Sequence, residues 1–554
     1  MPKINLKVKI LCAIIPLLGF IFGCNQVFQH TNNEIPVGFC DVENECDGFE
    51  ISSTKNTERA FSGNFSVRLN KDIPVSLVFK YTGVKSDDVF QLSVWKWGEA
   101  QGSIVFYDKS ENASYQLESR IVKEKNGWQQ LQAFMYFPPF IKDSEAKFFL
   151  YNPEQQPVWF DDFKVTKLKT EVFPQYSDVD HLEIYMDTEA MGQLKRNRVL
   201  LAKNSMQYEL KDKWVNGELT IEYEPVKAKI RLKGDRMSNI MGEKWSLRIE
   251  LCGKNKWKDF GKFSIHRPEF RSFIKEWLMR KFFKKESVFI TNYGFVPVSL
   301  NDKSLGIYAY EEHMTKSLLK KQGRVGAVII KMDDKPFWDA ESRGETDRKP
   351  AIMAAEIEVF GNRNKTDNAQ FEKAKKLLDS FRNMEKGASE IFDVAQTAKY
   401  YALCDVLGAY HGNFWINERW WFNPEEEKLE PIGHDGYGMG EFTWLNAPFF
   451  GYAETDTVFV NDYSLAITLN LFNDPIFTEK YLKALEKYAK KGFVEQILAE
   501  NNDSIAHYEE LLKREYPYYQ YNASGLQENA KAIRYHLEKY KKRFVDAFPV
   551  FVYR

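Results

Sequence analysis

Short stretches in which hydrophobic and polar residues roughly alternate fill the first part of the chain and predict β-strands. Examples are VFQLSVWKW and WQQLQAFMYF, which are rich in aromatic residues and are separated by polar loops at sandwich-like spacing. The last such stretch, VWFDDFKV, ends near Leu168. We therefore predict that residues 37–168 form an all-β sandwich, with most of the aromatic side chains in its core.

A different pattern follows, in which strand-like stretches come first and helix-like stretches later. HLEIYMDTEAMGQLKR predicts a strand and then a short helix that opens at Asp187–Thr188. FIKEWLMRKFFKK has hydrophobic residues near helical spacing, with lysines on the opposite face. Further helices are predicted at 351–360, 369–384 and 391–407, and from Pro475 onward. We predict an α+β fold for residues 171–554, with a mostly β half, a mostly α half and a cleft between two lobes.

The sandwich stretches AFSGNFSVRL and VWFDDFKV resemble the jelly-roll modules appended to extracellular carbohydrate-active proteins. This resemblance implies a jelly-roll fold and a glycan as a candidate ligand, bound through an exposed aromatic side chain. The adjacent aspartates Asp161 and Asp162 are candidate ligands of a structural Ca²⁺, because calcium prefers oxygen ligands. A solvated strand edge is the alternative interpretation of these two aspartates.

The N-terminal segment has the features of a bacterial export signal. Lysines precede an apolar run from Ile10 to Phe22, and LGFIFGC then resembles a lipobox. The resemblance implies a lipoprotein signal peptide over residues 1–23, a lipid on Cys24 and a tether over residues 24–36. A short membrane anchor or an ordinary signal is the alternative.

No later stretch has the roughly 18 apolar residues of a membrane helix. We therefore expect a lipid-anchored lipoprotein of the cell envelope, whose body faces the periplasm or the cell exterior. Asn25 follows the lipid cysteine where an aspartate marks inner-membrane retention in some bacteria, which favours the outer membrane.

The charge balance and the cysteine content limit the kinds of binding site that the sequence supports. The 554 residues carry 77 lysines and arginines against 78 aspartates and glutamates, and this near balance offers no basic field for nucleic acid. Cys40 and Cys46 are close enough for a small-loop disulfide, which an oxidising compartment permits. Cys252 and Cys404 are expected to be buried thiols, and no cysteine or histidine spacing indicates zinc.

The segment NERWWFNPEEEKLEPIGHDGYGMG predicts a strand, a tight acidic turn and a second strand. Asn417 and Asp435 stand at the two open ends of this hairpin, where we expect their side chains to lie close together. An amide oxygen and a carboxylate can share Mg²⁺, which binds about six oxygens and keeps several waters. Eukaryotic-type protein kinases use this arrangement of an asparagine, a hairpin and a metal-binding aspartate.

The region from about His181 to Gly440 resembles the CotH kinase family. The matching pieces are IRLKGD with KWSLRIEL, VSLNDKSLGIYAYEEH, VIIK and DVLGAYHGNFWINERWWFNPEEEKLEPIGHDG, in the order of the family. The resemblance implies a divergent, two-lobed protein-kinase-like fold over residues 171–554. It also implies an extracytoplasmic kinase that uses ATP with Mg²⁺ or Mn²⁺ to phosphorylate serine or threonine of an exported protein.

The resemblance carries roles over to residues of this chain. The candidate metal ligands are Asp435 and Asn417, and the candidate nucleotide-binding residues are Lys331, Glu312, Lys233 and Arg236. Glu312 fits the family pattern GxYxxxE and Lys331 follows a short strand, which matches the phosphate-pairing lysine and supporting glutamate of kinases. Lys233 and Arg236 flank a glycine and are candidates to cover phosphates. Each of these four residues is alternatively a surface charge.

The chain departs from the family at two places. Residues 412–413 stand where many members carry an aspartate before the asparagine, and Tyr437 stands where a second carboxylate often lies. Asp405 and His411 are the remaining candidate catalytic groups, since a loose transition state demands little of a base. Alternatively, these two residues satisfy each other or Arg419.

Two other functions stay open. A catalytically silent, pseudokinase-like core would serve as a surface scaffold that binds glycan or protein. A glycoside hydrolase would need two positioned carboxylates, for which the sequence shows no motif.

Overall fold

The computed structural model describes most of the chain in two compact units. The described residues are 34–52, 54–100, 102–108, 113–117, 119–137, 144–168, 173–174, 176, 178–204, 213–234, 237–324, 328–345, 349–360, 368–438, 470–516 and 519–547. The first unit comprises residues 1–247, 297–306 and 514–518, and the second comprises 248–296, 307–513 and 519–554. The predicted signal peptide, Cys24 and Arg236 lie outside the described residues.

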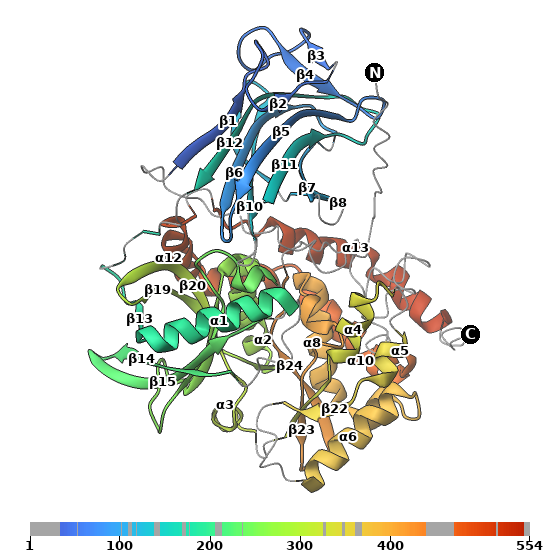
Figure 1. Ribbon diagram of the computed structural model, residues 1–554. Helices are drawn as coiled ribbons and strands as arrows, with labels where there is room; N and C mark the ends of the chain where they lie inside the picture. The colour runs from blue at the N-terminus through green and yellow to red at the C-terminus, as the bar shows by residue number, and fades with distance from the viewer. Residues whose placement is uncertain are drawn as a thin grey trace. The chain divides into compact units, whose positions relative to one another are not determined.

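Strands β1 to β12 of the first unit form two antiparallel sheets, which Figure 1 shows as two layers. One sheet has the order β3-β4-β12-β6-β10-β9, with β1 paired to β12, and the other has the order β2-β5-β11-β7-β8. The bounds are Glu34–Cys40 (β1), Phe49–Glu50 (β2), Lys55–Asn56 (β3), Ser66–Leu69 (β4), Val75–Val84 (β5), Val89–Trp97 (β6), Ser103–Asp108 (β7), Ala113–Gln116 (β8), Ser119–Lys125 (β9), Trp128–Tyr136 (β10), Ser144–Tyr151 (β11) and Val158–Leu168 (β12). The predicted all-β sandwich is confirmed.

The core of the sandwich follows from strand alternation. Successive side chains of a strand point to opposite faces, and Phe90, Leu92 and Val94 of β6 are all fully buried. The ring of Phe90 lies 5.7 Å from that of Phe148 on the opposite sheet. Aromatic side chains therefore join the two sheets, as the sequence pattern predicts.

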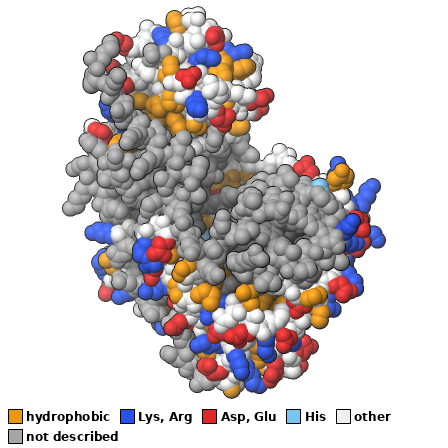
Figure 2. Space-filling model, turned by 90° about the vertical axis from the view of Figure 1, so that its right-hand side faces the viewer, with side chains coloured by type: hydrophobic (Ala, Val, Ile, Leu, Met, Phe, Trp, Pro, Cys, Tyr) orange, Lys and Arg blue, Asp and Glu red, His pale blue; other side chains and the backbone are white. Residues whose placement is uncertain are grey.

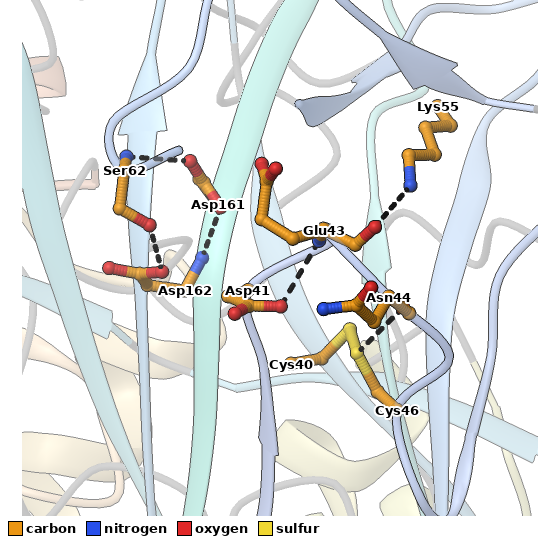
Figure 3. Close-up of a disulfide and its surroundings, with 9 residues drawn as sticks. All are labelled: Cys40, Asp41, Glu43, Asn44, Cys46, Lys55, Ser62, Asp161 and Asp162. Carbon is orange, nitrogen blue, oxygen red and sulfur yellow. Dashed lines mark hydrogen bonds between the residues drawn. A yellow bond between two sulfur atoms is a disulfide. The ribbon is translucent and has the colours of Figure 1, made fainter. Parts of the chain in front are cut away.

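Cys40 and Cys46 form the expected disulfide, which Figure 3 shows beside Asp161 and Asp162 of β12. Between the two cysteines, Glu43 accepts hydrogen bonds from the backbone N–H groups of residues 64 and 65, both at 2.7 Å. Asp161 accepts from the N–H groups of residues 61 and 62 at 2.8 and 3.0 Å. These carboxylates hold the segment 61–65 against the sheet.

The calcium prediction gains no support from the described residues. Asp161 already faces backbone donors, and burial raises its pKa to about 7 despite them. Nowhere in the described ranges do three or more His, Cys, Asp or Glu side chains gather in a group that could hold a metal ion.

The first unit continues beyond the sandwich with strands and one helix. Their bounds are Leu182–Tyr185 (β13), Thr188–Asn204 (α1), Val215–Ile221 (β14), Glu224–Leu232 (β15) and Met237–Ile240 (η2). The helix opens at the predicted place, because Asp187 accepts a hydrogen bond from the N–H of Ala190 at 2.7 Å, but it runs for 17 residues and is not short. Three strands contribute residues to both units: Leu247–Leu251 (β16), Tyr293–Leu300 (β19) and Lys303–Glu312 (β20).

The second unit contains a five-stranded sheet that carries the predicted hairpin. Its order is β18-β24-β23-β21-β22. The bounds are Phe289–Ile290 (β18), Ile329–Met332 (β21), Ile357–Val359 (β22), Trp420–Asn423 (β23) and Lys428–Gly433 (β24). Its core is a cluster that includes Phe289, Ile329 and Trp421, and all three side chains are buried. The hairpin β23–β24 is thus anchored in a packed sheet.

Helices and short strands complete the second unit. They are Lys262–His266 (β17), Pro268–Arg271 (η3), Ile274–Lys285 (α2), Lys316–Lys321 (α3), Lys335–Ser342 (α4), Lys349–Ala354 (α5), Asn368–Arg382 (α6), Ala388–Ile391 (α7), Val394–Leu407 (α8), His411–Asn413 (η4), Asn470–Asn473 (η7), Pro475–Ala489 (α10), Phe493–Glu500 (α11), Asn502–Lys513 (α12) and Ser524–Ala547 (α13). The prediction of one helix over residues 351–360 is wrong. Its second half is strand β22, because Ile357 to Val359 pair with β21 and long-range pairing overrides local pattern.

The described surface agrees with the balanced composition. Among the coloured side chains on the face drawn in Figure 2, basic and acidic groups are interspersed, and these described residues form no extended basic surface there. In the part of the chain that the structure describes, no helix combines the length and the apolar character needed to cross a membrane.

We expect the Cys40–Cys46 disulfide to stabilise the sandwich by about 2 kcal/mol, because it closes a loop with a sequence separation of 6 and constrains the unfolded chain. Chemical unfolding with and without a reductant measures this difference. The Cys46→Ser variant is the control, and its unfolding should not respond to the reductant. If both proteins respond equally, the effect of the reductant does not come from the Cys40–Cys46 disulfide.

Candidate functional site

The β23–β24 hairpin brings the two ends of the predicted metal site together. Trp420 lies opposite Pro431 and Asn423 lies opposite Lys428, so the open end of the hairpin joins the residues before β23 to those after β24. Asn417 precedes β23 and Asp435 follows β24. The sequence analysis therefore predicted the hairpin correctly.

His411 connects the two candidate metal ligands. The side-chain amide of Asn417 donates to the carbonyl oxygen of His411 at 2.8 Å. The Nδ1 atom of His411 lies 3.0 Å from the carbonyl oxygen of Asp435 and 3.3 Å from its carboxylate. Three residues singled out in the sequence thus converge in one place.

Glycine allows this close approach. A Cβ atom at position 412 would lie 2.5 Å from the carbonyl oxygen of His434, so no larger residue fits there without movement. The family aspartate that is absent at residues 412–413 has no room at position 412 in this arrangement. Asn413 is fully buried, and its Oδ1 accepts from the hydroxyl of Tyr400 at 2.7 Å.

Asp435 is held as a carboxylate by positive charge. Its backbone has a φ of 55°, which is uncommon for a residue other than glycine, and its carboxylate forms an ion pair with Arg271. Burial alone would raise the pKa of Asp435, but the charges of Arg271 and His411 outweigh burial and hold this pKa well below its usual range.

The residues present fit a divalent ion with oxygen ligands. Asp435 Oδ1 is buried and makes no hydrogen bond, although cationic groups face it. Asn417 donates through its nitrogen, which leaves the amide oxygen as the group for a cation. Two protein oxygens suit Mg²⁺, because Mg²⁺ usually keeps several waters and takes substrate phosphates as further ligands.

Sequence reasoning missed the residues that support Asp435 from α2. Glu276, which is fully buried, accepts from the backbone N–H groups of Gly436 and Tyr437 at 3.3 and 3.0 Å. It also pairs with Arg280 one turn later, and Arg280 contacts Glu311 at 2.7 Å. The i,i+4 spacing of Glu276 and Arg280 is visible in the sequence, but it usually indicates a solvated helix face.

Lys331 lies among acidic side chains in the same unit. Its Nζ atom is 3.0 Å from Glu358 and 3.5 Å from Asp334. Burial and the neighbouring Arg419 lower the pKa of Lys331, whereas the two acids raise it. The glutamate that contacts Lys331 is therefore Glu358 of β22, on the strand that the sequence analysis took for a helix.

Glu312, the predicted supporting glutamate, has other neighbours. It accepts a hydrogen bond from the side-chain amide of Asn292 and lies 3.9 Å from Lys321. Burial raises its pKa above the usual value for a glutamate. Its predicted role at the nucleotide stays a prediction.

Arg419 interacts electrostatically with both Lys331 and Asp435. Burial lowers the pKa of this arginine, and the carboxylates of Asp334, Asp435 and Glu358 act in the opposite direction. The positive charge of Arg419 also lowers the pKa of Lys331 and the pKa of His434. The charge of Arg419 thus opposes protonation of Lys331, while the carboxylate of Asp435 raises the pKa of Arg419.

The two candidate catalytic groups occupy different environments. Asp405 is completely buried on α8, where it accepts hydrogen bonds from the hydroxyls of Tyr410 and Tyr481. His411 instead faces Asp435 and is partly exposed, with 24% of its side chain accessible. The structure brings His411 into contact with the candidate metal ligands, and the catalytic role of Asp405 stays a prediction.

Lys233 follows β15 in the first unit, where its backbone N–H donates to the carbonyl of Ser246 at 2.8 Å. Its predicted contact with phosphates stays a prediction, as does that of Arg236, which lies outside the described residues.

The model of the family described as CotH kinase protein matches residues 230–544, which is more than half of the chain. The chain belongs to the CotH kinase family. The match covers the β23–β24 hairpin and the residues around Asp435, and it extends through α10, α11 and α12 into α13. A comparison with curated proteins finds no match.

The solved structures similar to the chain include carbohydrate-binding modules. The CBM22-1 xylan-binding domain of Paenibacillus barcinonensis Xyn10C is 12% identical over 26% of this chain and 99% of that domain, with a TM-score of 0.20. A family 16 carbohydrate-binding module is 14% identical over 22% of this chain and 90% of that module, with a TM-score of 0.17. We draw no conclusion about ligands from similarity at this level.

We expect Glu276→Gln to lower the free energy of unfolding by about 3 kcal/mol, because it removes one partner of a buried ion pair. The matched control is Glu479→Gln on α10, whose i,i+4 partner Lys483 is exposed. That variant should unfold like the parent, because exposed pairs contribute little. Urea titration measures both variants, and equal effects would refute a special role for Glu276.

We expect His434 to make stability fall as the pH decreases from about 6.5 to about 4. Burial and the nearby Arg419 lower its pKa to about 4, so over this range the unfolded chain binds a proton that the folded protein excludes. His434→Gln should lose this component of the pH dependence. Urea unfolding of both proteins at several pH values is the measurement, and parallel stability curves would contradict the expectation.

Proposed function

We propose that this CotH kinase family member is an extracytoplasmic phosphotransferase that moves phosphate from ATP to serine or threonine of an exported protein. The observation that carries the proposal is the convergence of Asn417, His411 and Asp435 at the open end of one hairpin. Family membership supports a kinase-like activity. The contacts among these three residues support the proposal that they perform it.

Asp435 and Asn417 would hold Mg²⁺ or Mn²⁺, which supplies charge neutralisation for the transferred phosphoryl group. Lys331 is the candidate partner of the phosphates, with Glu358 and Asp334 keeping it charged and oriented. His411 lies beside Asp435, where it can orient the acceptor hydroxyl or take its proton. A two-lobed kinase-like arrangement with a cleft is part of this proposal.

The location and the partners of the protein are proposals that the sequence supports. The lipobox-like segment before Cys24 supports a lipid anchor in the cell envelope. The sandwich is proposed to bind glycan, since partly exposed aromatic side chains such as Trp97 occur there. If the kinase site is silent, this module would make the protein a surface scaffold.

We expect Asp435→Ala to weaken binding of the Mn²⁺–ATP complex at least about a hundredfold and to abolish autophosphorylation, because the variant lacks the carboxylate that faces the metal. Isothermal titration measures binding, and transfer of labelled phosphate measures activity. The control is Asp503→Ala. Asp503 is an exposed residue of α12, so this variant should match the parent in binding and in activity.

Thermal unfolding of each variant shows whether it is folded. A parent protein that binds no nucleotide with either Mg²⁺ or Mn²⁺ would refute the phosphotransferase proposal and favour the scaffold. Retained binding in a folded Asp435→Ala variant would instead refute the assignment of the metal site.

A further inference from the structure

A cation of the protein itself already faces the carboxylate of Asp435. Arg271, the last residue of η3, forms an ion pair with Asp435 through its Nε atom. The side chains are 24% and 16% exposed respectively, so solvent screens this pair only in part. Arginine remains protonated in proteins, and its charge therefore stays at this carboxylate until the side chain moves.

The backbone around Arg271 is held in an uncommon conformation. Ser272 and Phe273, which follow it directly, both have a φ of 51°, and a bulky aromatic residue rarely adopts such a value. Conformations of this kind are unfavourable for residues other than glycine and persist only where surrounding contacts enforce them. The short segment from 271 to 273 is therefore a defined elbow between η3 and α2.

Contacts on both sides enforce this elbow. The hydroxyl of Ser272 donates to the carbonyl of Gly438 at 3.0 Å, in the same loop as Asp435. The ring of Phe273 lies 4.5 Å from that of Tyr519, whose hydroxyl accepts from the N–H of Ile274 at 3.3 Å. Together with Glu276, which binds the amides after Asp435, these contacts place the guanidinium opposite the aspartate.

A guanidinium and a divalent ion compete for the same carboxylate oxygen, because each cation weakens the binding of the other to it. Asp435 Oδ1 faces Arg271 and is the atom that we assign to the metal. Positive charges a few ångströms apart repel strongly where water is partly excluded. A metal ion that binds Asp435 must therefore weaken or displace the ion pair with Arg271.

We propose that Arg271 is a positioning residue that acts as the resident counter-cation of Asp435: it holds the carboxylate in place without metal, and a divalent ion displaces it. The inference rests on the proposed metal site at Asp435. The displaced guanidinium is then free to bind an anionic group such as a phosphate, which a fixed structural ion pair would not do.

The test is the affinity of the full-length protein for Mn²⁺ alone, measured from the electron paramagnetic resonance signal of free Mn²⁺. Arg271→Gln should bind Mn²⁺ about tenfold or more tightly than the parent, because the competing charge is gone. Arg271→Lys keeps the charge and should remain within about threefold of the parent. A structural role alone would leave the affinity unchanged or reduce it.

Arg324→Gln is the matched control. Arg324 forms a comparably buried pair with Glu430 at 2.9 Å, and its guanidinium lies over the rings of Phe289 and Trp421, away from the hairpin end that carries Asp435. It should lose stability as Arg271→Gln does, with unchanged Mn²⁺ affinity. Equal or weaker Mn²⁺ binding by Arg271→Gln, or the same gain in Arg324→Gln, overturns the proposal.

A second measurement on the unaltered protein covers the case in which Arg271→Gln does not fold. Hydrogen exchange followed by mass spectrometry should show that Mg²⁺ slows exchange in residues 433–438 and speeds it in residues 270–274. Slower exchange in both segments would overturn displacement of Arg271. If Mn²⁺ binding to the parent is absent or survives Asp435→Ala, the proposed metal site itself fails, which is a separate outcome.

Discussion

The ion pair between Arg271 and Asp435 determines how the candidate site is organised, because an aspartate in this position needs a positive charge. Asp435 is mostly buried, and its backbone adopts a left-handed conformation. Without a cation, the carboxylate would lose solvation and would tend to take up a proton. The pair keeps it ionised, and Glu276 fixes the two amides that follow it.

This constraint explains why α2 matters to a site that otherwise belongs to the hairpin. The elbow before α2 supplies Arg271, and the first turn of α2 supplies Glu276. Arg280, one turn further on, compensates the charge of Glu276, so the buried acid is itself paired. Asp435 and Glu276 thus each have a partner of opposite sign, which limits the cost of burying them.

The sequence predicted those parts of the molecule that local pattern determines. The alternation of hydrophobic and polar residues identified the sandwich. The polar turn NPEEEK between two strand-like stretches identified the hairpin that joins Asn417 to Asp435. Strand β22 was missed because its three residues are strand only through pairing with β21, and with it the partnership of Lys331 and Glu358 was missed. Long-range pairs of this kind leave no periodic signal.

Tyr437 shows how a departure from the family fits the charge balance of the site. Where a second carboxylate often lies, Tyr437 is buried and its hydroxyl donates to the carbonyl of Leu407 at 2.7 Å. With Arg271 paired to Asp435, these two side chains are together neutral, so a bare divalent ion gains less here than at a pair of carboxylates. Under the proposed metal site a metal–nucleotide complex would differ, because its phosphates would offer the displaced guanidinium a new anionic partner. Under the proposed displacement of Arg271, linkage requires that metal and nucleotide each strengthen the binding of the other, so the proposal favours the complex over either component alone.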